Sequence, residues 1–450
     1  MSEPLGATAR RIFAHTIAAV DVQSAVRARI SLNLTDLVLA GVPISLQALE
    51  GVLVIAMGKA AVSMYAAVEA ALAGLPIKAV VVAPPETLPL MATGDAGTDV
   101  VYLPGDHPTP TEASLDAADR ILQALSMVTP RTVVLFLISG GASAMVERPL
   151  APDISLDDLR VFTRAIVGSG LSITAMNALR KHMSAVKGGR LAQAAAAAAM
   201  QCTLLVSDVP HASPDAVASG PSLPDSTTVA DCRALFNSLQ QTTQLPASVL
   251  RWFRSPGLAE TPKPEDSAFA RAHREVVLSS DSLAYAAVRA AEVEGLFAVV
   301  DNTCDEWEYR EAALYLLHRA ESLAREARRP VCLISVGEVG VTLNAQPGEG
   351  GRNQQFALWC ARKAADLGIR ATVLSAGSDG VDGHSTAAGA VCDESTVIRA
   401  AALGWSAEEA LTAFNAAPLL QAVGDALHTG PTGNNLRDLR LILIEPSQQN

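Results

Sequence analysis

The chain has 450 residues and is half hydrophobic, with 4% aromatic and 18% charged residues. This length predicts two domains, and a composition rich in Ala, Val and Leu is typical of a helix-rich α/β protein. The net charge of −12 excludes an extended nucleic-acid-binding surface, because phosphate backbones require basic side chains.

The cysteines and the N-terminus indicate a cytoplasmic protein. The six cysteines are scattered without a Cys-x-x-Cys pair, which predicts reduced thiols and neither a disulfide framework nor a zinc site. The first 20 residues lack a long apolar core followed by a small-residue cleavage site, so we expect no signal peptide. Long apolar runs are interrupted by Gly, Pro or charge, so we expect no contact with a membrane.

Strands and helices alternate in the first half of the chain. An amphipathic helix is expected first, at residues 8–30. Short apolar runs then predict strands, separated by helices, at residues 51–57, 79–82, 99–103, 132–138 and 202–206. The run at 132–138 is unbroken and rich in β-branched residues, as in a strand covered on both faces. This order predicts a right-handed parallel βαβ array.

Polar residues follow several of these strands, at the edge where open α/β sheets bind ligands. Lys59 comes after the first strand, at a helix N-terminus, and is placed to meet an anion; the alternative is a surface lysine. A glycine-serine turn follows the strand at 132–138, and its N–H groups and hydroxyls suit an anion, although a tight turn also favours small residues. The turn consists of Ser139, Gly140, Gly141, Ala142 and Ser143. His107 is either a catalytic base or, as we favour, a residue that orients its loop.

Basic residues are densest just before residue 191, where Arg180-Lys181-His182, Lys187 and Arg190 lie near a glycine pair. They form either an anion site or a solvated helix end, where the helix dipole favours cations. The alanine tract at residues 192–199 predicts a helix without chemistry. Asp208 follows the strand at 202–206 and is a candidate base or metal ligand.

The second half of the chain repeats the pattern after a weakly patterned stretch at residues 231–267, which we interpret as a surface excursion or linker. Strands are expected at residues 297–302, 331–336, 371–376 and 439–444, with a hairpin at 342–351. Gly-Gly-Arg at 350–352 begins a helix and indicates a further anion site, because the planar guanidinium of arginine can bind a phosphate or carboxylate with two hydrogen bonds. Asp379 and Asp382 lie in a glycine-rich loop that suits magnesium, although Asp-Gly is also ordinary turn chemistry.

These residues together favour phosphoryl transfer. The sequence contains neither GxGxxG nor GxxxxGK[ST], so neither a dinucleotide fingerprint nor a P-loop is supported. Phosphoryl transfer requires positive charge, a divalent ion and tight positioning. Candidates for these parts are Lys59, Arg190, Arg352, Asp208 and Asp379. The residues alone therefore predict a two-domain enzyme acting on small phosphorylated or carboxylated substrates.

Seven segments, in order along residues 51–444, resemble the glycerate 2-kinase family. They are LISGGASAMVERP, MNALRKHMSAVKGGRLA, SDVPHASPDAVASGPSLPD, SVGEVGVTL, GEGGRNQQFAL, GSDGVDGHSTAAGAV and TGPTGNNLRDL. The resemblance implies a larger Rossmann-like parallel-sheet domain and a smaller α/β MOFRL domain, with the active site in the cleft between them. We place these domains at residues 1–245 and 276–450, joined by a linker at 246–275.

The resemblance also implies ATP- and Mg²⁺-dependent phosphorylation of D-glycerate at its 2-hydroxyl, giving 2-phosphoglycerate. By position in the motifs, Lys59 and Arg352 would hold glycerate and stabilise the transferring phosphoryl group. Asp208 would bind metal or activate the hydroxyl, and Asp379 would be the second metal ligand. Substrate or phosphate would contact Ser139, Gly140, Gly141, Ser143, Arg190 and Asn353, and the nucleotide would contact Gly377, Asp379, Thr429, Gly430, Thr432, Gly433 and Asn434.

Two departures from the family pattern leave other substrates open. His211-Ala212 stand where the family usually has Gly-Asp, and residues 415–420 replace an Asp-Ser-Tyr type stretch, so a related sugar acid is an alternative acceptor. Two rivals are an NAD(P)H-dependent hydroxypyruvate reductase, a label that family members often carry, and a non-catalytic sensor of a sugar acid. In every case the partner is a small acid, and family analogy alone suggests a homo-oligomer.

Overall fold

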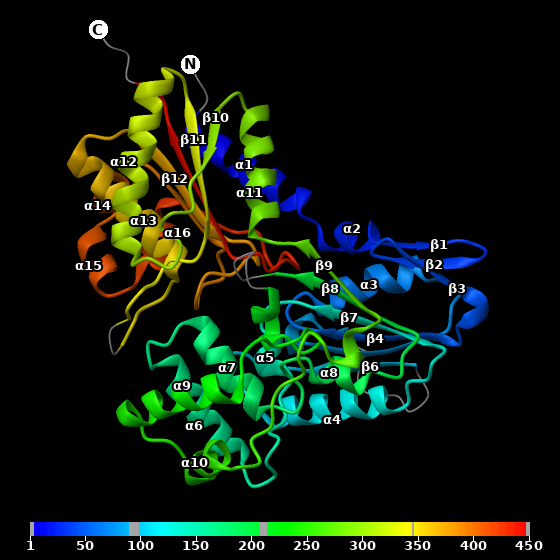
Figure 1. The fold of residues 1–450 in the computed structure, drawn as a ribbon. Helices are drawn as coiled ribbons and strands as arrows, with labels where there is room; N and C mark the ends of the chain where they lie inside the picture. Colours follow the sequence, from blue (N-terminus) through cyan, green and yellow to red (C-terminus); the bar gives the residue numbers. More distant parts are fainter. Residues whose placement is uncertain (1–3, 90–98, 208–213, 344–345, 447–450) are drawn as a thin grey trace. The chain divides into compact units, whose positions relative to one another are not determined.

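The computed structural model describes residues 4–89, 99–207, 214–343 and 346–446. The chain divides into two compact units (Figure 1). We call Val22–Val277 the N-terminal unit, and Met1–Asp21 together with Leu278–Asn450 the C-terminal unit.

The N-terminal unit is built on a six-stranded sheet in the order β6-β5-β4-β7-β8-β9. These strands are β4 (Gly51–Met57), β5 (Ile77–Ala83), β6 (Val100–Pro104), β7 (Thr132–Ile138), β8 (Met200–Val206) and β9 (Ala272–Leu278). The five strands from β6 to β8 pair in parallel, which confirms the expected array. Six of the seven residues of β4 and of β7 are buried, as a strand covered on both faces requires.

Helices cover this sheet and add a second layer of packing. α3 (Ala61–Ala71), α4 (Glu112–Ser126) and the short α8 (Arg190–Ala194) flank the strands. A separate apolar core lies among α6 (Leu156–Val167), α7 (Ile173–Met183), α9 (Val229–Thr242) and α10 (Ala247–Arg254). In this core the rings of Phe236 and Phe253 stack with centroids 4.5 Å apart. The stretch that we interpreted as a linker therefore contains two packed helices.

Two further expectations, for the first helix and for the alanine tract, differ from the structure. The expected first helix is two helices, α1 (Leu5–Ala19) and α2 (Val22–Arg27), followed by a small antiparallel sheet of β1 (Ile30–Leu32), β2 (Asp36–Leu39) and β3 (Val42–Ser45). The alanine tract is helical only to Ala194, because the chain must turn to enter β8 at Met200.

The C-terminal unit contains a mixed sheet in the order β10-β11-β15-β12-β13-β14. Its strands are β10 (Phe297–Val300), β11 (Val331–Gly337), β12 (Ala371–Gly377), β13 (Gly389–Cys392), β14 (Ala426–Leu427) and β15 (Asp438–Ile444). β15 runs antiparallel to both β11 and β12, and its register places Asp438 opposite Gly337 on one side and Gly377 on the other. The described part of residues 342–351 contains no strand, so the hairpin prediction was wrong.

Helices pack on both faces of the mixed sheet (Figure 1). One face is covered by α12 (Tyr309–Ala327) and α13 (Arg352–Leu367), and the other by α1 and α11 (Ser280–Val293). A second core forms between α13 and three shorter helices, α14 (Glu394–Ala402), α15 (Ala407–Thr412) and α16 (Ala416–Val423). Arg11 of α1 forms an ion pair of 2.7 Å with Glu294, at the end of α11. The first 21 residues therefore belong to the C-terminal unit, whereas we had placed them in the first domain.

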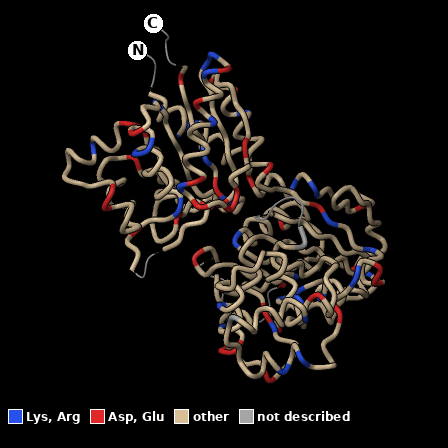
Figure 2. The backbone as a smooth tube through the Cα atoms, turned by 60° about the vertical axis from the view of Figure 1, so that its left-hand side comes forward, with Lys and Arg blue, Asp and Glu red and all other residues tan. Residues whose placement is uncertain are grey.

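Charged groups are interspersed along both units (Figure 2), as the acidic and mixed composition suggests. Among the residues that the structure describes, no helix is long and apolar enough to cross a membrane.

Candidate active site

The order of the parallel strands marks one edge of the N-terminal unit as a site. The chain adds β5 and β6 on one side of β4 and then returns to add β7 and β8 on the other side. In open α/β sheets, ligands bind beyond the carboxyl ends of the strands where this direction reverses. Lys59 follows β4 and Ser139 follows β7, so both lie at this point of reversal.

Hydrogen bonds tie the two loops together. The main-chain N–H of Lys59 donates to the carbonyl of Gly140 at 3.0 Å, and the N–H of Ala60 donates to Ser139 Oγ, also at 3.0 Å. Gly58 has φ = +113°, and a Cβ there would lie 2.4 Å from Ser139 Oγ. Only glycine permits so close an approach in this conformation, so the loops depend on both residue types.

Lys59 and His107 flank the glycine turn. A Cβ on Gly141 would lie 3.4 Å from Lys59 Cγ and 3.5 Å from His107 Cδ2. Burial lowers the pKa of His107, and the positive charges of Lys59 and Arg180 lower it further. The imidazole is therefore neutral at neutral pH and able to accept a hydrogen bond.

A chain of hydrogen bonds leads from the turn to helix α7. Ser143 Oγ lies 3.0 Å from Ser219 Oγ, which donates to Asn177 Oδ1 at 2.9 Å. A guanidinium nitrogen of Arg180, one helical turn after Asn177, donates to the same oxygen at 3.4 Å. Asn177 and Ser219 were absent from our predicted site, and Arg180 was named only as part of the basic patch. The i, i+3 spacing of Asn177 and Arg180, which puts them on one face of a helix, was the available signal.

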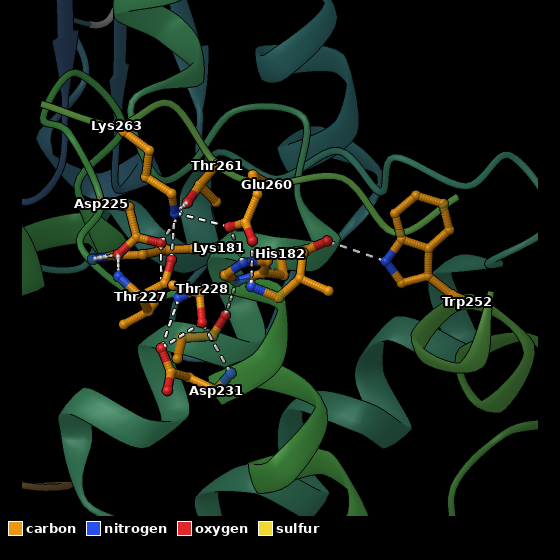
Figure 3. A network of polar contacts seen from close by, with 12 residues as sticks. Lys181, His182, Asp225, Thr227, Thr228, Asp231, Trp252, Glu260, Thr261 and Lys263 are labelled. Atoms are coloured by element: carbon orange, nitrogen blue, oxygen red, sulfur yellow. Dashed lines mark hydrogen bonds and ion pairs between the residues drawn. The ribbon is translucent and has the colours of Figure 1, made fainter. Parts of the chain in front are cut away.

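The rest of the basic patch is buried in the protein instead of solvated. Lys187 lies against Glu147, with 2.5 Å between Nζ and Oε2. Lys181 forms an ion pair of 3.1 Å with Asp225, and both side chains are almost fully buried. Figure 3 shows this pair inside a wider network, in which Asp225 also accepts hydrogen bonds from Thr227 and Thr261.

Arg190 lies next to that network. Its Nε donates to the carbonyl of Ser184 at 2.9 Å. Burial lowers the pKa of Arg190, and the negative charge of Asp225 opposes that change. A role for Arg190 in binding substrate stays a prediction.

In the C-terminal unit, the predicted residues gather where β11 and β12 end and β15 begins. Arg352, the first residue of α13, donates to Asp438 with Nε–Oδ2 and Nη2–Oδ1 distances of 2.5 and 3.1 Å. Its Nη2 also lies 2.9 Å from Glu338 Oε1. Burial would lower the pKa of Arg352, but Asp438 and Glu338 outweigh it and raise this pKa. The guanidinium is thus held charged, with its side chain 37% exposed.

The N-terminus of α13 is occupied by a carboxylate of the protein. Asp382 accepts from the main-chain N–H groups of Asn353 at 3.0 Å and Gln354 at 2.8 Å, and from the Asn353 side chain at 3.3 Å. Burial raises the pKa of Asp382 to about 7, although these donors oppose the rise. We expected an external anion at this helix start, but Asp382 lies there, 29 residues away in sequence. The other side of the Asn353 amide accepts from Ser375 Oγ at 2.6 Å, and its contact with substrate stays a prediction.

Two predicted nucleotide loops contact each other. The N–H of Thr432 donates to the carbonyl of Asp379 at 3.1 Å, and Gly380 lies so close that a Cβ there would be 2.0 Å from the carbonyl oxygen of Gly430. Asn434 donates its N–H to Thr432 Oγ1 at 3.2 Å. The structure therefore brings together the predicted residues Gly377, Asp379, Thr429, Gly430, Thr432, Gly433 and Asn434. Their contact with a nucleotide stays a prediction.

The described residues supply only part of a possible metal site. A Cβ on Gly377 would lie 3.0 Å from Asp379 Oδ1 and 3.7 Å from Asp438 Oδ1, so two carboxylates approach one point. Within the described part of the chain, no group of three or more His, Cys, Asp or Glu side chains is arranged to hold a metal ion. Asp208 and His211-Ala212 lie outside the described residues.

Comparisons with known proteins identify the family. Residues 8–254 match a family model described as "Domain of unknown function (DUF4147)", and residues 331–438 match the MOFRL family. The D-glycerate 2-kinase of Thermotoga maritima is 34% identical over 88% of this chain and 91% of its own, and a putative hydroxypyruvate reductase of Agrobacterium vitis is 36% identical over 87% and 86%. The crystal structure of a glycerate kinase from Thermotoga maritima superposes with a TM-score of 0.80 at 31% identity, covering 98% of this chain and all of that one. The chain therefore belongs to the glycerate 2-kinase family, some of whose members are named hydroxypyruvate reductase.

Proposed function

We propose that this protein transfers the γ-phosphoryl group of ATP to the 2-hydroxyl of D-glycerate, releasing ADP and 2-phosphoglycerate. The observation that carries this proposal is the joined Lys59 and Ser139–Gly140 loops at the point of strand reversal, in a chain of the glycerate 2-kinase family. The oxygen–phosphorus bond to glycerate forms as the bond to ADP breaks, and the hydroxyl proton leaves to a base.

The two catalytic cations have different surroundings. Lys59 stands beside the glycine turn and the neutral His107, where it would neutralise charge on the acceptor and the moving phosphoryl group. Arg352 is held by Asp438 and Glu338 at the edge of the other sheet, where its exposed part would contact the phosphoryl oxygens. The predicted location between the two domains stays a prediction.

Magnesium fits the residues of the C-terminal unit. Mg²⁺ is usually held by one or two carboxylates, waters and substrate phosphates, so a cage made only of protein groups is not needed. Asp379 is the proposed ligand there, with Asp208 as the second. When bound, the ion would neutralise negative charge on the phosphates. Asp208→Asn should then require much more magnesium for the same turnover, and an unchanged magnesium dependence would remove Asp208 from this role.

Alanine variants test the two catalytic cations. We expect Lys59→Ala and Arg352→Ala each to lower turnover by about 10²- to 10³-fold, the effect of losing one group that stabilises transition-state charge. Lys78→Ala and Arg370→Ala, which remove exposed cations from the same two units, are matched controls and should retain turnover. Near-normal turnover in Lys59→Ala or Arg352→Ala would remove that residue from the mechanism.

The proposed location is the cytoplasm, and the proposed assembly is a homo-oligomer. All six cysteines are buried as free thiols, which supports a cytoplasmic enzyme. A homo-oligomer rests on family analogy alone, and light scattering that gave the mass of one chain would reject it.

A further inference from the structure

The N-terminal unit holds a cation, Arg180, that we noted from the sequence in the basic patch but to which we gave no role in the site. Arg180 lies in α7, one helical turn after Asn177, and Asn177 is joined through Ser219 to Ser143 of the glycine-serine turn. The structure gives its guanidinium one hydrogen bond, from Nη1 to Asn177 Oδ1. The other N–H groups of this guanidinium therefore donate no hydrogen bond to the described residues.

A chain of hydrogen bonds from the glycine-serine turn fixes the position of Arg180. Asn177 is 3% exposed, and its oxygen also accepts the hydroxyl proton of Ser219, whose Oγ contacts Ser143 Oγ. Ser219 itself has φ = +60°, a conformation that a serine adopts at a cost in energy. These contacts orient Asn177, and through it Arg180, relative to the turn.

The charges around the turn favour a negatively charged ligand. Arg180 and Lys187 bring two positive charges to this region, and among the described residues Glu147 forms an ion pair with Lys187 and none with Arg180, which leaves one positive charge in excess. His107 adds no charge in its neutral form. Such an excess in a protein of net charge −12 indicates that an anion completes the site.

We propose that Arg180 binds the carboxylate of the acceptor, with Asn177 and Ser219 as positioning residues. The planar guanidinium matches a carboxylate with two parallel hydrogen bonds. The carboxylate is favoured over a nucleotide phosphate because Arg180 is joined through Asn177 and Ser219 to the turn at the strand-reversal point, whereas Asp379 and the loop that contacts it lie in the C-terminal unit. This inference rests on the proposed function, because glycerate is the acceptor that supplies the carboxylate.

Binding measurements without nucleotide test this role directly. Isothermal titration with D-glycerate should give a dissociation constant about 100-fold or more higher for Arg180→Gln than for the wild type, the effect expected when one partner of a charged pair is lost. Arg180→Lys keeps the charge without the fork and should give an intermediate value. Arg164→Gln removes an exposed arginine from α6 and should bind like the wild type. Thermal unfolding of each variant controls for the fold.

Kinetic constants separate the carboxylate from the phosphates. In both Arg180 variants, KM for D-glycerate should rise while KM for ATP changes less than about twofold, and turnover of glycerol, which lacks the carboxylate, should not fall. Unchanged D-glycerate binding in a folded Arg180→Gln variant, or a rise in KM for ATP instead, would overturn the assignment. If the wild type binds D-glycerate but releases no ADP, the proposed function fails while the binding constants still decide the role of Arg180. If the wild type does not bind D-glycerate, both fail.

Discussion

Replacing Asp382 by asparagine tests how the start of α13, and with it Arg352, is held. Asp382 is 2% exposed and accepts hydrogen bonds from the first residues of that helix. Asparagine has the same shape but cannot ionise, and its NH₂ group cannot accept from an N–H donor. The variant therefore loses one of the acceptors at the helix start, at a cost of about 1 kcal/mol in the free energy of unfolding.

The dependence of stability on pH gives the sharper prediction. Burial raises the pKa of Asp382 to about 7 in the folded state, against 3.8 for an unperturbed aspartate. Between these values the folded state binds more protons than the unfolded state, so this residue stabilises the fold less as pH rises. Integrating the two titrations from pH 5 to pH 7 gives a loss of about 2 kcal/mol in the wild type. The asparagine variant lacks this loss.

Urea unfolding at pH 5 and pH 7 measures the difference. Three of the four tryptophans, Trp307, Trp359 and Trp405, lie in the C-terminal unit, so fluorescence reports mainly on the unit that contains Asp382. The free energy of unfolding of the wild type should fall relative to that of Asp382→Asn by about 2 kcal/mol over this interval. Asp393→Asn makes the same exchange at the N-cap of α14 in the same unit and is the matched control for replacing a carboxylate at a helix start. Parallel pH profiles for the wild type and Asp382→Asn would refute the reasoning.

Three other predictions follow from the N-terminal unit. Gly58→Ala places a Cβ 2.5 Å from the carbonyl oxygen of Ser139 at a positive φ, so it should lower the free energy of unfolding by about 2 kcal/mol or more; a change below about 0.5 kcal/mol in urea unfolding would contradict this. Asp225→Ala leaves Lys181 buried without its carboxylate and should lower the free energy of unfolding by about 3–5 kcal/mol. The double variant Lys181→Met/Asp225→Leu has no buried charge and should regain most of this free energy. Equal losses of stability in the two variants would show that the buried charge is not the cause. NMR titration of His107 should give a pKa below the ordinary 6.5, and Arg180→Gln should raise this pKa. An unchanged His107 pKa in the variant would show that Arg180 does not act on His107.

The sequence predicts best the elements that are buried on both faces. β4 and β7 begin and end at the predicted residues, because a parallel strand between two helical layers is a continuous apolar run. The polar residues after them then follow from the rule that ligands bind at the carboxyl ends of strands. Lys59 and Ser139 were found in this way.

Contacts between distant segments account for what the sequence did not show. Arg180 and Lys181 are adjacent, yet a helix turns by about 100° per residue, so Arg180 contacts Asn177 and Lys181 contacts the buried Asp225. Asp382 caps a helix 29 residues earlier in the chain, and Arg11 pairs with Glu294 across 283 residues. Local patterns carry no record of such pairings. The insertion of β15 between β11 and β12 is hidden for the same reason.

The most direct test of the proposed function is a coupled assay for ADP release from ATP and magnesium with D-glycerate, run beside NADH oxidation with hydroxypyruvate. We predict ADP release that depends on D-glycerate and yields the 2-phosphate. ADP release with another sugar acid but not with D-glycerate would show that the chain is a kinase with a different acceptor. NADH oxidation without ADP release would contradict the kinase account.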